Sequence, residues 1–180
     1  LLPPFSPQAI DKLIPKARAI CNQQIDRFAD RGRCDGAVDY AQHIPTRVMA
    51  HMLGLPESDG EQFRKWITEI LQDGITDDGV LYRGLEEITE YFREHMHVRR
   101  GSPGDDLISY LTQQRYPDGQ PFTDNHVLGT LRLLLIAGID TTWSGIGSCI
   151  WHLAKTPADR ERRRPGLALE QTFRRRRPRD

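Results

Sequence analysis

The stretch LRLLLIAGIDTTWSG, Leu131–Gly145, decides how this chain folds. It has the apolar character of a core helix, yet it places Gly138, Asp140, Thr141 and Thr142 near its centre. Glycine adds to the entropy cost of forming a helix, and short polar side chains compete for backbone hydrogen bonds. The combination therefore predicts a long helix whose centre serves a purpose that ordinary packing does not require.

The predicted helix starts after Thr123, a favourable N-cap residue, and the apolar pattern continues to about Lys155. A helix over this range is roughly 48 Å long. Residues three or four apart share a face, so a narrow track of mostly small side chains is expected along it. The track consists of Leu134, Ala137, Thr141, Gly145 and Ser148. A flat molecule fits against such a surface.

The centre of this helix has two interpretations. In the first, Thr141 bonds back to the carbonyl of Ala137, and Gly138 leaves room for water so that the helix bulges. Asp140 then supplies a carboxylate beside the hydroxyl, and the pair forms a relay that passes protons from solvent to a bound molecule. In the second, the small residues only allow close helix packing, which the spacing taken alone favours.

The rest of the chain is also predicted to be helical, without internal repeats. Ser6 before Pro7 marks a helix start, and Pro15 is expected to split that segment into a short helix and a longer one through about Phe28. Further helices are predicted at about 45–53, 60–74, 80–100 and 107–111, with caps at Ser58 or Asp59, Asp77 or Asp78, and Asp105. A buried face is predicted for Leu81, Leu85, Ile88, Phe92 and Met96. Residues 32–38 are expected to be irregular or strand-like, and 116–122 to form a turn with a short strand on each side.

Composition bounds the class of protein. The 180 residues are 38% apolar and 28% charged, which fits one globular domain. No uninterrupted apolar run reaches the roughly 18 residues of a membrane span, so no membrane association is expected. The three cysteines, Cys21, Cys34 and Cys149, contain no C-x-x-C pair, which argues against a disulfide framework and a zinc site and favours a reducing, cytoplasmic setting.

Four segments together resemble the cytochrome P450 superfamily, in its bacterial soluble form. AGIDTT (137–142) resembles the pattern of the long distal helix that lies across the haem. LLPPFSPQAI (1–10) resembles the segment after the haem-contacting helix, IPTRVMAHMLGLP (44–56) the helix before the substrate lid, and GDDLISYL (104–111) the stretch before the distal helix. The resemblance covers about residues 1–160, in order.

The resemblance implies a mainly α, partial cytochrome P450 fold, a helical lid region plus a long central helix, and a haem monooxygenase activity. Thr141 becomes the hydroxyl that steadies dioxygen and Asp140 its acidic partner in proton delivery, while Ala137 and Gly138 line the oxygen groove at the haem. The substrate side is assigned to Leu133, Ile136 and Ala137, whose apolar surfaces favour an apolar organic substrate. The implied partners are dioxygen and an electron donor, either a ferredoxin or a reductase.

Two family motifs are missing from the sequence. The family holds the haem iron through a cysteine in F-x-x-G-x-[H/R]-x-C-x-G beyond the distal helix, and no such motif occurs here. The E-x-x-R matches at Glu61, Glu90 and Glu161 lie before the distal helix or too close behind it. The chain is therefore expected to be an internal part of such an enzyme, to lack the haem-ligand half and any metal ligand, and to be inactive alone.

The C-terminal segment differs from the rest. Residues 161–180 contain eight arginines against three acids, a local charge of +5 in a chain with a formal charge of zero. The expected division is a partial P450 domain over 1–161 and an Arg/Pro-rich tail over 162–180, either disordered or translated out of frame. The alternative function is a non-catalytic helical interaction module whose basic tail binds nucleic acid or an acidic partner, although the tail offers only Phe173 for stacking.

Overall fold

The computed structural model describes residues 3–163, and every regular element in that range is helical. The main helices are α1 (Pro7–Ala29), α2 (His43–Met52), α3 (Gly60–Leu71), α4 (Asp78–Gly101), α5 (Leu107–Thr112), α6 (Asp124–Lys155) and α7 (Pro157–Arg163). Shorter turns are η1 (Pro3–Phe5), η2 (Gly36–Ala41), η3 (Glu57–Asp59) and η4 (Asp73–Ile75). The predicted mainly α class is confirmed.

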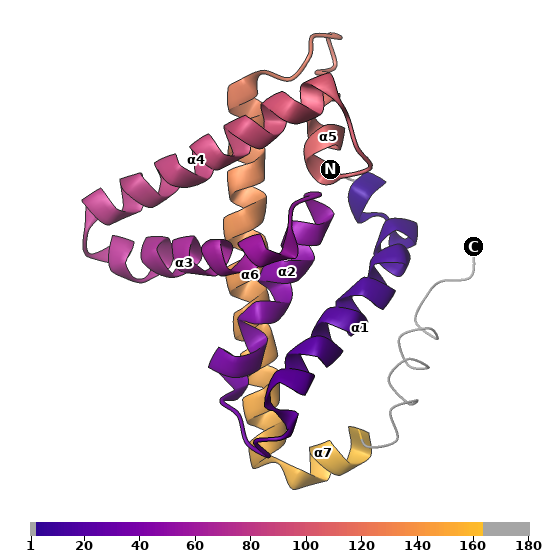
Figure 1. The fold of residues 1–180 in the computed structure, drawn as a ribbon, viewed down its shortest axis with the longest axis vertical. Helices are drawn as coiled ribbons and strands as arrows, with labels where there is room; N and C mark the ends of the chain where they lie inside the picture. Colours follow the sequence, from indigo (N-terminus) through magenta and orange to yellow (C-terminus); the bar gives the residue numbers. More distant parts are fainter. Residues whose placement is uncertain (1–2, 164–180) are drawn as a thin grey trace.

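The long helix α6 is the spine of the molecule (Figure 1). Its predicted N-cap is confirmed, since the Thr123 side chain accepts a hydrogen bond from the backbone N–H of His126 at 3.3 Å. Helices α3 and α4 form a hairpin that projects to one side of α6, and α1 runs along the other side, next to α2. α6 therefore connects both parts of the fold.

The predicted split of the first helix at Pro15 is wrong, because α1 continues through this residue. Proline removes one backbone hydrogen bond and crowds the preceding turn. Pro15 lies on the exposed side of α1, where water can replace the lost bond. The predicted start is correct, because Ser6 accepts from the N–H of Ala9.

Three local predictions also need correction. The connector after α1 ends in a π-helical turn, η2, which Asp35 caps by accepting from the N–H groups of Ala37 and Val38 at 2.8 and 3.0 Å. α5 is capped by Asp106 instead of Asp105. The expected strands around residues 116–122 reduce to one isolated bridge between Arg115 and Pro121, although the turn itself is present.

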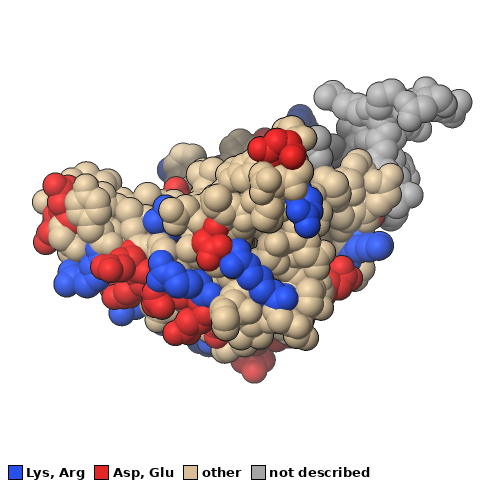
Figure 2. Space-filling view, turned by 90° about the horizontal axis from the view of Figure 1, so that it is seen from above, with Lys and Arg blue, Asp and Glu red and all other residues tan. Residues whose placement is uncertain are grey.

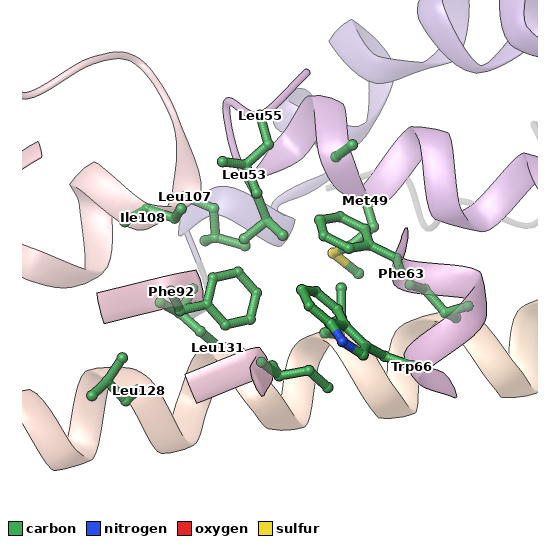
Figure 3. Close-up of a cluster of buried hydrophobic side chains, with 14 of the residues drawn as sticks. Met49, Leu53, Leu55, Phe63, Trp66, Phe92, Leu107, Ile108, Leu128 and Leu131 are labelled. Atoms are coloured by element: carbon green, nitrogen blue, oxygen red, sulfur yellow. The ribbon is translucent and has the colours of Figure 1, made fainter. Parts of the chain in front are cut away.

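The hydrophobic core lies where α2, α3, α4 and α5 meet one side of α6. Figure 3 shows Phe63, Trp66 and Phe92 gathered between the other helices and Leu131 of α6. The buried face predicted for α4 is confirmed by Ile88, Phe92 and Met96, which are at most 2% exposed, while Leu81 and Leu85 are partly buried against the same cluster. Apolar burial on this scale is the main stabilising contribution in a fold of this size.

The C-terminal part of the chain is described only as far as Arg163. Helix α7 (Pro157–Arg163) runs across the expected domain boundary at residue 161. The rest of the predicted Arg/Pro-rich tail, residues 164–180, lies outside the described residues. Across the part that is described, Lys and Arg side chains alternate with Asp and Glu on the face seen in Figure 2, so that face presents no extended basic patch.

Candidate functional site

The two sides of α6 differ sharply in burial. Every fourth residue from Leu131 is buried: Leu131, Leu135, Ile139 and Trp143. The residue two positions after each of these is exposed: Leu133, Ala137, Thr141 and Gly145. Two residues correspond to roughly 200° of rotation, so the two sets lie on opposite sides of the helix. We call the exposed set, together with the exposed Ser144 and Ser148, the open face.

The predicted site residues fall into two groups around this face. Leu133, Ala137 and Thr141 are aligned on the open face, and Leu133 is 66% exposed. Asp140 and Ile136 lie along one edge of it and are partly buried. The predicted track is thus reproduced from Ala137 onward, whereas its first member, Leu134, is partly buried against the core.

The threonine hydroxyls bond to their own helix. Thr141 Oγ1 donates to the carbonyl of Ala137 at 2.7 Å, and Thr142 Oγ1 donates to the carbonyl of Gly138 at 2.8 Å. The expected bulge is absent, because α6 is α-helical without interruption from Asp124 to Lys155. The Thr141 oxygen keeps free acceptor capacity toward the open face, and rotation about its side-chain bond would redirect its proton.

Gly138 has a packing role that the sequence does not reveal. A Cβ atom on this residue would lie 2.7 Å from Cε of Met49 on α2, so glycine allows α2 to approach α6 closely. Gly36 plays the same part for η2, since a Cβ there would lie 2.8 Å from Cγ2 of Ile150. Both contacts involve residues far apart in the sequence, and no local signal identifies them.

The Asp140 carboxylate makes no hydrogen bond or ion pair for which a partner is found among residues 3–163. Its neighbour Thr141 is about 100° away around the helix axis, so the carboxylate lies at the edge of the open face. In an otherwise apolar helix, an acid in this position is available to a molecule on that face.

No group of three or more His, Cys, Asp or Glu side chains within residues 3–163 is arranged to hold a metal ion. Cys34 and Cys149 are exposed thiols, and Cys21 is half-buried. Of the two histidines on α4, His97 is exposed, whereas His95 is half-buried with its ring centroid 4.6 Å from that of Tyr91.

Two prominent cavities within residues 3–163 are lined by residues outside the open face. A cavity of about 430 Å³ lies between η1, α1, α2 and α5, where its lining includes Ile10, Met52 and Tyr110. A second, of about 340 Å³, lies between α1, η2 and α2 beside Arg31 and His43.

Helix α6 is long and apolar enough, by length and composition only, to cross a membrane. The most apolar window has a mean hydropathy of 1.4, and 17% of it is buried. This finding leaves the expectation of no membrane span untested, because the core helix of a soluble protein meets the same criteria. An apolar helix that is buried on one side only needs a further apolar partner.

Comparisons with known proteins identify the family to which the chain belongs. A family model for cytochrome P450 matches residues 78–164. The chain is 34% identical to the cyclomarin C epoxidase CymV of Salinispora arenicola, over 94% of the chain and 46% of that protein. The curated relatives are spanned over only 35–46% of their length.

Solved structures agree with the family model. The structure of the polyketide synthase cytochrome P450 PksS from Bacillus subtilis matches with a TM-score of 0.83 and 26% identity, over 91% of this chain and 42% of that one. The myxobacterial cytochrome P450 CYP267B1, solved in complex with myristic acid, matches with a TM-score of 0.78 and 36% identity, over 91% and 41%. By family model, relatives and fold, the chain belongs to the cytochrome P450 superfamily and represents part of the P450 fold.

Proposed function

We propose that this chain is the part of a haem-thiolate monooxygenase that lies on the dioxygen-binding side of the haem. In this proposal the open face of α6 is the surface that lies across the haem. The observation that carries the proposal is the position of Thr141 on the exposed side of α6, opposite the packed stripe that ends at Trp143. A helix whose only purpose is packing has no need for this polar, small-residue side.

The residues of this chain fit one face of a haem, while the ligand for the opposite face is missing from it. Ala137, Thr141 and Gly145 form a shallow surface without large side chains, against which a planar ring can lie. The thiolate that the family requires is not provided in a matching motif, and Cys149 lies on α6 itself. When bound in a complete enzyme, haem supplies the two-electron activation of dioxygen, with one oxygen atom going to substrate and one to water.

Thr141 and Asp140 are assigned the proton chemistry. The Thr141 hydroxyl accepts a hydrogen bond on the open face while its proton rests on the Ala137 carbonyl, and rotation turns that proton outward. Asp140, at the edge of the face, takes up a proton from solvent and passes it to the hydroxyl, which is a general acid relay. Gly138 supports this position by letting α2 pack closely behind it.

Substrate contact is assigned to Leu133, Ile136 and Ala137, which lie one to two turns before Thr141. Their surfaces are apolar, and the relative crystallised with myristic acid is consistent with an apolar organic substrate. The proposed partners are dioxygen and a ferredoxin or reductase as electron donor. The proposed setting is the cytoplasm, with α6 as a core helix instead of a membrane span and residues 162–180 as a tail separate from the P450 part.

A chimaera tests the assignment. Residues 1–161 would replace the corresponding part of cyclomarin C epoxidase, and the purified protein would be examined for the thiolate-type spectrum with carbon monoxide. We expect haem incorporation in the chimaera, and none of thiolate type when haemin is added to the present chain alone. A chimaera that folds but holds no haem would contradict the placement of the open face.

The relay is tested separately in the same chimaera. Thr141→Ala and Asp140→Asn are expected to keep the haem spectrum. They are expected to lower the share of electrons that ends in product and to raise the share that ends in hydrogen peroxide, because proton delivery to dioxygen is impaired. Thr142→Ala is the matched control, since its hydroxyl bonds to Gly138 on another side of the helix. An unchanged ratio of product formed to electrons consumed in both test variants would overturn the assigned roles.

A further inference from the structure

The two ends of the α3–α4 hairpin meet at a single cluster of polar groups. The turn before α3 contributes the backbone carbonyl of Gly54, the last turns of α4 contribute His95 and Arg99, and the start of α5 contributes Asp106. We call these four residues the base cluster. Gly54 and Asp106 lie within two of the segments that resemble the family, but the proposed oxygen chemistry uses none of the four residues.

Arg99 contacts every other member of the base cluster. Its Nη2 donates to the carbonyl of Gly54, its Nε donates to Oδ2 of Asp106 at 3.4 Å, and its Nη1 lies 3.3 Å from Nδ1 of His95. The side chains of Arg99 and Asp106 are only 15% and 10% exposed. A planar guanidinium can bridge several acceptors at once, which a lysine cannot do in the same way.

The partners of Arg99 are themselves held in place. Gly54 has a φ of +69°, and a Cβ atom there would lie 2.6 Å from Cβ of Asp106, so the turn and α5 are in close contact. The N–H of Leu55 bonds back to the carbonyl of Ala50, which closes the end of α2. Asp106 caps α5 by accepting from the N–H and the hydroxyl of Ser109.

A hydrogen bond between Arg99 and His95 needs a neutral imidazole. Arg99 can only donate, so Nδ1 of His95 must present its lone pair, and the ring proton must be on Nε2. Protonation of Nδ1 would replace this hydrogen bond with repulsion between two cations.

Several charged and titratable groups surround the ring. Tyr91 packs against it and donates to Oδ2 of Asp59 at 2.5 Å, while Glu94 and Arg99 belong to the same helix. Burial, followed by the charge of Arg99, lowers the pKa of His95, and Asp59 and Glu94 oppose this shift. The stabilisation from neutral His95 is therefore present above its unfolded pKa and is lost as the pH falls through the lower folded pKa.

The far end of the hairpin has no comparable fixation. Ile75 and Tyr82, near the turn between α3 and α4, are 78% and 68% exposed, and the hairpin projects away from α6 there (Figure 1). Trp66 and Glu87 join the two helices to each other through a hydrogen bond of 2.8 Å. The hairpin is thus an internally linked unit. Besides its core packing against α6, it is held by Arg132, which donates to Thr89 at 3.1 Å, and by the ion pair of Arg100 with Asp124, so the base cluster is one of several attachments that set its orientation.

We propose that Arg99 is the positioning residue of the α3–α4 hairpin, and that acidification releases it through protonation of His95. In this arrangement the turn at Gly54, the end of α4 and the start of α5 move apart together when the imidazolium forms. The consequence is a hairpin that is fixed near neutral pH and loosened in acid.

Amide hydrogen exchange on the full 180-residue chain tests the first part. The reporters are the N–H groups of Leu55 and Ser109, which bond to Ala50 and Asp106. In Arg99→Gln, protection factors at both amides are expected to fall by about tenfold or more, since local opening becomes easier. Arg93→Gln is the matched control, because Arg93 pairs with Glu90 on the exposed side of α4, away from the base cluster. If Arg99→Gln does not fold, Arg99→Lys serves instead and is expected to give an intermediate loss.

A pH series from about 7.5 down to about 5 tests the second part, with rates corrected for intrinsic exchange. Protection at the two reporters is expected to fall in the unmodified chain but to change much less in His95→Gln, which keeps an acceptor without titrating. Unchanged protection in a folded Arg99 variant would overturn the positioning role. Equal pH dependence in the chain and in His95→Gln would overturn the release by protonation.

Discussion

The two sides of α6 have the same length and the same helical period but different surroundings. One side carries large apolar residues such as Leu135, which is fully buried, and the other carries Leu133, Ala137 and Thr141 in the open. The packed side explains why the helix forms where it does. Under the proposed function, the open side accounts for Asp140 and Thr141, whereas Gly138 is accounted for by the close approach of α2.

The largest expected effect separates the two sides directly. Leu135→Ala should lower the free energy of unfolding by about 2–5 kcal/mol, since it leaves a cavity in the core. Leu133→Ala removes the same atoms from an exposed position and should change it by less than about 0.5 kcal/mol. Urea denaturation followed by circular dichroism measures both. Similar losses for the two variants would show that the open side is covered in the isolated chain.

The second prediction concerns self-association. An apolar helix surface left in water promotes contact between copies of the chain. Leu133→Ser should therefore weaken self-association severalfold, as measured by sedimentation velocity over a range of concentrations. Ile75→Ser, at a position that is 78% exposed but lies on the hairpin, is the control and should have little effect. Equal effects of both variants would argue against a special role for the open side.

Replacing glycines of α6 by alanine is expected to have a smaller effect than Leu135→Ala and to raise stability instead of lowering it. A Cβ atom at Gly145 meets nothing within 4 Å, so Gly145→Ala should stabilise α6 by about 0.5–1 kcal/mol through helix propensity. Gly138→Ala should gain less, because Met49 must move to make room. The difference in thermal unfolding midpoint between the two variants is the measurement. A larger gain at Gly138 would contradict the close approach of α2.

The smallest expected effect is at Thr141. Thr141→Val keeps the shape of the side chain and removes only its hydrogen bond to the Ala137 carbonyl, which also serves the helix backbone. The free energy of unfolding should change by no more than about 0.5 kcal/mol, because surface substitutions of this kind are nearly neutral. A decrease in the free energy of unfolding well above that value would show that the Thr141 hydroxyl stabilises the fold, and would argue against the proposed relay.

Much of the helical framework was predictable from sequence because its signals are local. The caps at Thr123 and Asp77 and the repeat of Ile88, Phe92 and Met96 each depend on residues within one helix. The alignment of Ala137 with Thr141 also follows from helix geometry alone. The resemblance of residues 1–160 to a known family was also visible, because each of the matching segments is a short local stretch of sequence.

Other features depend on contacts between distant segments, and the sequence could not reveal them. The continuity of α1 through Pro15 depends on which side of that helix meets water. The packing role of Gly138 depends on Met49, about ninety residues earlier, and the convergence of Gly54, Arg99 and Asp106 depends on three separate elements. The predicted roles of Asp140 and Thr141 stay predictions until the variants are measured.

The opposition of the two sides of α6 has a consequence for how such a protein can change over generations. Substitutions at the exposed Leu133 or Ala137 alter the surface that the helix presents to the proposed substrate, while Leu135 and Ile139 are buried in the core. Energetic effects at sites that share no partners add nearly independently. Substitutions on the exposed side of α6 can therefore change substrate preference with little effect on the stability that the buried side provides.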